Sequence, residues 1–114
     1  MKLSGSTKGQ GISVAATSSG GTAIDARGED PENGELRDVL GYHFFAVNND
    51  DADVLLTIEF GGTAANNLIE KTIKAGEGLV TVVNGLMLEA PVAITAFAAT
   101  ADKIMIYGDV REMS

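Results

Sequence analysis

The single histidine and the acidic residues are the side chains of this sequence best suited to chemistry. His43 lies between two aromatic residues, Tyr42 and Phe44, in an apolar stretch. Acid–base catalysis would require a nucleophile or an orienting carboxylate beside it, and no spacing in the chain selects one. We therefore predict a partly buried, hydrogen-bonded histidine in a β-strand and no catalytic residue.

Two acidic segments could hold a cation or provide a pair of carboxylates. Residues 48–53 (NNDDAD) have the composition of a calcium loop, but the glycine and the glutamate that EF-hand spacing requires are missing. Asn and Asp also favour tight turns, so we predict a hairpin turn there. Residues 25–38 contain six acidic residues. They predict a solvated acidic loop, since nothing in the sequence places two of them across a glycosidase-like cleft.

Composition excludes several further classes of function. The chain has no cysteine, which rules out disulfides, thiolate metal sites and cysteine nucleophiles, and one histidine rules out a multi-histidine metal site. Gly9-Gln10-Gly11 and Gly76-Glu77-Gly78 lack the third glycine of a phosphate-binding loop. With 16 acidic and 8 basic residues, the net charge of −8 is unfavourable for binding nucleic acid. We therefore expect no enzyme activity, cofactor, metal or nucleic-acid partner.

The length of 114 residues fits one domain. The first residues, MKLSGS, lack the apolar core of a signal peptide, and the apolar stretch 91–99 is too short to cross a bilayer, so no membrane association is expected. Residues 1–10 are rich in Gly, Ser, Thr and Lys and predict a flexible N-terminal arm. The net charge is uneven, because residues 25–53 contain nine acidic residues and two arginines.

The elements that must position these residues have the patterns of short β-strands. Apolar alternation or continuous apolar runs predict strands at 11–16, 22–24, 42–47, 54–60, 79–83, 86–88, 92–98 and 104–110. Residues 68–74 suit a strand or a helical turn, and 35–40 could form a short helix. Asn84-Gly85 indicates a tight turn or a bulge.

About seven to nine short strands at a spacing of roughly 8–12 residues predict an all-β fold. We expect a single β-sandwich or jelly-roll-like domain over residues 11–114, with antiparallel strands and the acidic loop at 25–38. Three of the strands, 79–83, 92–98 and 104–110, are apolar on both faces. This excess of apolar surface indicates contacts with other protein subunits. A carbohydrate-binding sandwich is an alternative, although the aromatic residues fall within strand patterns typical of a core.

Strands and turns succeed one another in a recognisable order from residue 41 to residue 112. The segments are 47–49 (VNN), 54–58 (VLLTI), 73–78 (IKAGEG), 84–96 (NGLMLEAPVAITA), 98–102 (AATAD) and 106–110 (IYGDV). This succession resembles small β-sandwich virion proteins of tailed bacteriophages, particularly head decoration (cement) proteins and related head or tail accessory proteins. The chain departs from them at Pro91, where Gly-Asp is common, and in the acidic insert 25–38.

The resemblance implies a structural protein without enzyme activity, a homotrimer or another ring of copies, and the major capsid protein as partner. We expect a capsid decoration protein that binds the outside of the shell and stabilises it, on the virion surface, after assembly in the host bacterial cytoplasm. A tail or head–tail connector accessory protein is the alternative within the same class.

Two groups of residues are expected to make the contacts. The N-terminal arm would dock on the capsid through Lys2, Leu3, Lys8 and Gln10, with Lys8 against a capsid carboxylate. The last strand would join the subunits through Ile104, Ile106, Tyr107 and Val110.

Overall fold

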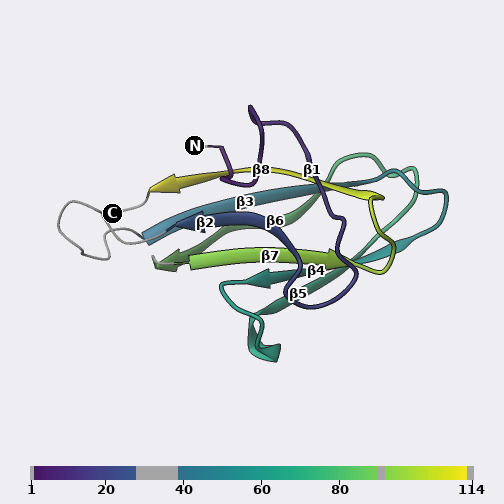
Figure 1. Ribbon diagram of the computed structural model, residues 1–114. Helices are drawn as coiled ribbons and strands as arrows, with labels where there is room; N and C mark the ends of the chain where they lie inside the picture. The colour runs from purple at the N-terminus through teal and green to yellow at the C-terminus, as the bar shows by residue number, and fades with distance from the viewer. Residues whose placement is uncertain (1, 28–38, 90–91, 113–114) are drawn as a thin grey trace.

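The computed structural model describes residues 2–27, 39–89 and 92–112. They form two four-stranded antiparallel sheets that pack against each other, and Figure 1 shows β8 and β3 in one layer above β7 and β4 in the other. Sheet A has the strand order β1-β8-β3-β6, and sheet B has the order β2-β7-β4-β5. The elements are β1 (Ile12–Ser13), β2 (Thr22–Arg27), β3 (Val39–Asn48), β4 (Val54–Phe60), the 3₁₀ helix η1 (Ala65–Asn67), β5 (Leu68–Ile73), β6 (Val80–Glu89), β7 (Val92–Ala98) and β8 (Ile104–Glu112). The predicted all-β fold with two antiparallel sheets is confirmed.

The core lies between the two sheets and follows from the two-residue period of the strands. Every second side chain of β3 and β4 points inward, which buries Tyr42, Phe44, Leu56 and Ile58 completely. The rings of Tyr42, Phe44 and Phe60 pack with centroids 5.6–6.3 Å apart at tilted or edge-on angles, as aromatic rings prefer. These three rings connect the inner faces of the central strands.

Two ambiguous stretches of the sequence are strands. Residues 68–73 form β5, and the predicted strands 79–83 and 86–88 are parts of one strand, β6. Gly85 has a φ of +81°, and the pairing with β3 slips by one residue between Tyr42 and His43. Asn84-Gly85 therefore forms a bulge within a strand, because glycine reaches this left-handed conformation without steric cost.

Residues 49–53 form a polar turn, but the predicted hairpin is wrong, because the turn connects β3 of sheet A to β4 of sheet B and these two strands do not pair. The Asn48 side chain accepts a hydrogen bond from the Asp50 N–H (2.8 Å), and its amide donates to the Ala52 carbonyl (2.9 Å) and the Ile73 carbonyl (2.8 Å). Asn48 thus fixes both the turn and the neighbouring end of β5. The acidic residues nearby extend its polar surface.

The predicted acidic loop is partly a strand, because its first residues, 25–27, belong to β2. Asp25 is 2% exposed, so it does not belong to a solvated loop. The remainder of the loop, and most of the possible helix at 35–40, lie outside the described residues. Within the described ranges, no helix is long and apolar enough to cross a membrane.

The N-terminal segment lies against the sandwich, so the structure does not confirm a flexible arm. The Leu3 side chain is 1% exposed and belongs to the core. The backbone N–H of Gly5 donates to the Ile24 carbonyl (2.9 Å), and the Ala26 N–H donates to the Ser4 hydroxyl (2.8 Å). Burial of Leu3 and the hydrogen bonds to β2 thus fix this segment against the sandwich, although its composition is typical of a flexible linker.

Candidate interaction surface

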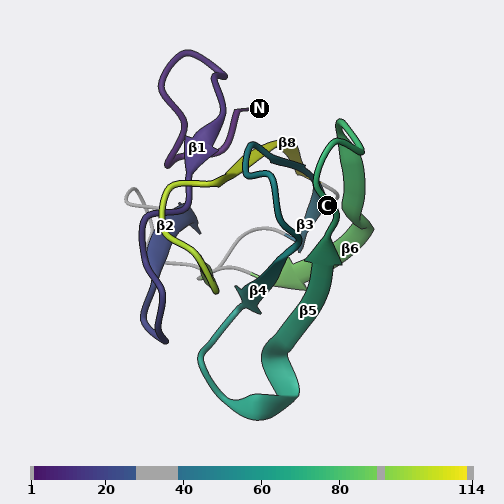
Figure 2. The same cartoon turned by 90° about the vertical axis from the view of Figure 1, so that its right-hand side faces the viewer.

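The N-terminal segment and the last strand, which the sequence assigned to separate contacts, lie side by side. Lys2 forms an antiparallel bridge with Asp109, and Ile12 pairs with Ile106. Between these points the Gly11 backbone lies against the Tyr107 ring, where a Cβ would come within 2.7 Å of Cζ. Figures 1 and 2 both show the segment before β1 next to β8.

A tight turn presents Lys8 at the tip of this segment. Lys8 and Gly9 both have positive φ values, 54° and 80°, and the Gln10 N–H donates to the Thr7 carbonyl (2.9 Å). Positive φ at both central positions is typical of a type I′ turn, in which glycine is favoured. At its base, the Ser6 hydroxyl donates to the Gln10 carbonyl (2.6 Å). Lys8 is exposed, and Figure 2 shows the loop projecting beyond the sheet.

Polar groups next to this loop form a small charged cluster on the outer face of sheet A. His43 Nδ1 lies 3.4 Å from Asp109 Oδ1, and Arg111 Nε lies 3.5 Å from Asp109 Oδ2. The His43 side chain is 31% exposed, which confirms a partly buried strand histidine, but the predicted hydrogen bond is not found at its buried Nδ1. The Arg111–Asp109 ion pair is exposed, so it adds little to the stability of the fold.

We call the exposed surface made by Lys8, Gln10, Tyr107, Asp109 and Arg111 the N-terminal face. Tyr107 is 39% exposed and contributes an aromatic ring to it. The Lys2 ammonium donates to the Ser6 carbonyl (3.0 Å) at the base of the loop. The face combines cations, one carboxylate and an aromatic ring, a mixture suited to recognition of a protein surface.

Four of the predicted contact residues belong to the core. Leu3, Ile104, Ile106 and Val110 are at most 1% exposed, since three of them occupy the inward positions of β8. Both faces of β8 are apolar in sequence, so the pattern alone did not identify the inward one. The exposed members of the two predicted groups are Lys2, Lys8, Gln10 and Tyr107.

Glu59 is a buried carboxylate that the sequence did not single out. It lies on the outer face of sheet B, is 1% exposed, and is covered by the loop of residues 17–21. Its carboxylate accepts hydrogen bonds from the Ser19 hydroxyl (2.7 Å), the Thr95 hydroxyl (2.6 Å) and the Gly20 and Gly21 N–H groups (both 3.2 Å). Glu59 therefore anchors that loop to the sheet.

The environment of Glu59 lowers its pKa. Burial beneath the single loop raises the pKa, but hydrogen bonds from Thr95, Ser19, Gly21 and Gly20 outweigh this effect and hold it below the ordinary value of 4.5. The ionised carboxylate is thus the form that fits this site.

This lowered pKa predicts a loss of stability in acid. The contribution of Glu59 to the free energy of unfolding is fully present above the pKa that Glu59 has in the unfolded chain, near 4.5. It is lost as the pH falls through the lower pKa that Glu59 has in the folded protein. Urea unfolding at a series of pH values should show wild type losing more stability than Glu59→Gln across this window. Equal losses in the two proteins would contradict the prediction.

The described parts of the chain contain no group of three His, Cys, Asp or Glu side chains able to hold a metal ion. The arrangement thus consists of one exposed face and one anchored loop. Comparison of the chain with protein-family models, with curated proteins and with solved structures found no match.

Proposed function

We propose that this chain is a structural protein of a tailed-bacteriophage particle, a decoration protein that binds the outside of the major capsid shell and stabilises it. The observation that carries the proposal is the N-terminal face, on which a hydrogen-bonded turn presents Lys8 and the following Gly11 lies against the exposed Tyr107 ring. A rigid loop loses less conformational entropy on binding than a flexible arm would. We therefore propose that the protein docks through this ordered face and not through a flexible arm.

The strand order supports a jelly roll as the finer description of the fold. Successive strands alternate between the sheets from β1 to β4 and from β5 to β8, and the orders β1-β8-β3-β6 and β2-β7-β4-β5 place the last strands beside the first. Eight strands in two sheets with Greek-key connections define the jelly roll, which occurs in viral capsid proteins and in lectins. This supports a virion protein and, equally, the carbohydrate-binding alternative.

Homo-oligomerisation is part of the proposal. Each copy would bind the shell through one small face, and several linked copies, as in the trimer expected from the sequence, would bind far more tightly through avidity. The acidic character of the chain, with a net charge of −8, favours basic surfaces on the partner. Lys8 would meet an acidic group within such a surface.

The decisive experiment changes Lys8 alone. Deleting residues 2–10 would remove Leu3 from the core, so loss of binding by that variant would not identify a contact. Lys8→Glu should weaken binding to capsid shells about tenfold, because it places like charges opposite each other. Co-sedimentation with capsid shells, assembled from a major capsid protein whose gene neighbours that of this chain, measures this.

Lys74→Glu is the matched control, because Lys74 is also exposed but follows β5 on sheet B. It should bind as wild type does. Equal binding by Lys8→Glu and wild type would exclude docking through Lys8, and the lack of a neighbouring capsid gene would count against the decoration function itself.

Two alternatives have distinct outcomes. A tail or connector protein would be present in fewer copies per particle, which quantitative mass spectrometry of virions measures. A carbohydrate-binding module would bind specific glycans through Tyr107, the exposed aromatic ring, and lose them on Tyr107→Ala. Tyr42, by contrast, is fully buried and cannot stack on a sugar.

A further inference from the structure

The edges of the two sheets differ in how they are protected from pairing with another strand. Edge strands expose unpaired backbone groups, and proteins protect them by shortening, covering or charging them. β1 has two residues, and the N-terminal segment covers β2 through its hydrogen bonds at Ile24 and Ala26. β5 carries the exposed charges Glu70 and Lys71.

β6 is the long edge strand without such protection among those described. It pairs only with β3 on one side, and residues 80–88 carry no charge. Its bulges leave Leu86–Glu89 as a regular segment, paired residue by residue with Tyr42–Val39. Leu86 and Met87 in this segment are 47% and 58% exposed.

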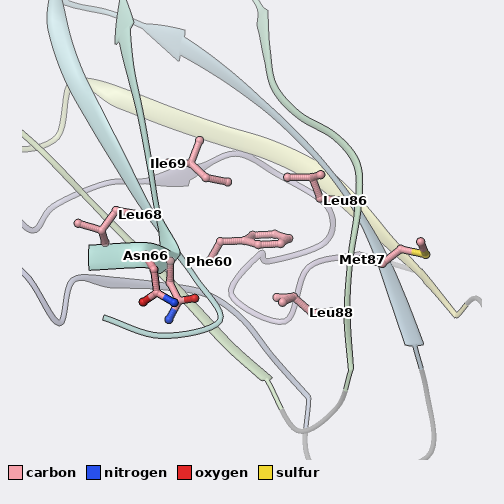
Figure 3. Close-up of a pocket in the computed structure, with 8 residues that line it drawn as sticks. Phe60, Asn66, Leu68, Ile69, Leu86, Met87 and Leu88 are labelled. Atoms are coloured by element: carbon pink, nitrogen blue, oxygen red, sulfur yellow. The ribbon is translucent and has the colours of Figure 1, made fainter. Parts of the chain in front are cut away.

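A groove of about 270 Å³, lined by apolar side chains and two asparagines, runs beside this segment, where the sandwich opens between β6 and β5. In Figure 3 the Phe60 ring points toward Leu86 and Leu88, whereas Met87 points away. Ile69 lies on the opposite wall, and none of the lining residues is charged. In a chain with a net charge of −8, this region carries no charge.

We infer that this edge pairs with the same edge of a second copy of the chain. Two copies with a net charge of −8 each repel each other, and the uncharged segment of the β6 edge lets them approach. Antiparallel pairing about a two-fold axis at Met87 places Leu86 of each copy opposite Leu88 of the other and closes both grooves. The charged residue of the segment, Glu89, then lies opposite Gly85 of the second copy, and no like charges face each other.

The contact involves few residues, so the dimer is weak and depends on protein concentration. Salt strengthens it, because screening reduces the repulsion between the acidic copies. The inference does not depend on the phage assignment. It adds a two-fold contact between copies to the trimer expected from the sequence.

Sedimentation equilibrium from micromolar to millimolar protein tests the proposal. Wild type should approach the mass of a dimer as concentration rises, and more so at high salt, whereas Leu86→Lys should stay monomeric. The matched control is Leu55→Lys, because Leu55 is a leucine of similar exposure, 41%, on β4 in sheet B. It should dimerise as wild type does. Circular dichroism verifies that both variants are folded.

Cysteine crosslinking locates the contact independently, since the chain has no native cysteine. Met87→Cys should give a disulfide-linked dimer on a non-reducing gel, because directly paired positions across strands lie within disulfide range. Leu55→Cys should not. A monomeric wild type, an oligomer that Leu86→Lys leaves unchanged, or equal crosslinking at both positions would overturn the β6 contact.

Discussion

Replacing Glu59 with alanine should lower the free energy of unfolding by about 3–4 kcal/mol, because a charged acceptor of four hydrogen bonds is lost. The Thr95 hydroxyl and the loop N–H groups of Gly20 and Gly21 would lose their common partner. The loop at 17–21 would then detach from sheet B, which limits the cost because part of it regains contact with water. Urea unfolding at neutral pH measures the change.

Two variants show whether the effect comes from this carboxylate. Glu59→Gln keeps one acceptor oxygen and should cost roughly half as much. Glu70→Ala removes an exposed glutamate from the neighbouring strand β5 and should change stability by less than about 0.5 kcal/mol. If Glu59→Ala were as stable as Glu70→Ala, Glu59 would not be an anchor.

Replacing Asp25 with alanine should also cost about 3–4 kcal/mol, because it leaves buried donors without an acceptor. The Tyr42 hydroxyl donates to Asp25 Oδ2 (2.8 Å) inside the core, and the Ser4 N–H donates to Oδ1 (2.7 Å). One side chain thus joins the N-terminal segment, β2 and β3. Urea unfolding gives the loss, and amide exchange at Ser4 and Gly5 should accelerate well beyond the global effect.

Tyr42→Phe is the control for this prediction. It removes the hydroxyl and keeps the ring, so it should cost about 1 kcal/mol and leave amide exchange at Ser4 unchanged relative to global stability. A double-mutant cycle between the two positions isolates their coupling. A larger loss for Tyr42→Phe than for Asp25→Ala would show that the carboxyl group is not the centre of this contact.

Periodicity predicted the strands well where one face is apolar or where turn residues mark the ends. The strands at 54–60 and 92–98 have the predicted bounds, and the bulge at Asn84-Gly85 was one of two predicted outcomes. Periodicity did not identify the inward face of β8, because Ile106 and Tyr107 are similarly apolar in sequence. Only the pairing of β8 with β1 and β3 decides which of the two side chains points inward.

The rest of the candidate site depends on contacts between segments distant in sequence. Leu3 is a lone apolar residue in a polar segment, and its burial follows from the position of β2, which local composition does not encode. Glu59 has the polar pattern of an outward strand position, and the loop that covers it lies some forty residues earlier. The structural roles of Asp25 and Glu59 as hydrogen-bond acceptors therefore follow from the fold, and no sequence motif predicts them.

The pairing of β1 with β8 has a consequence for how the protein is made. Residue 12 pairs with residue 106, so sheet A cannot be completed until β8 has been synthesised and has left the ribosome. Closing such long loops before any contact is gained makes folding slow, and partly synthesised chains expose unpaired strands. Folding of this domain is therefore completed only after β8 has been made, and its rate depends on the arrival of that strand.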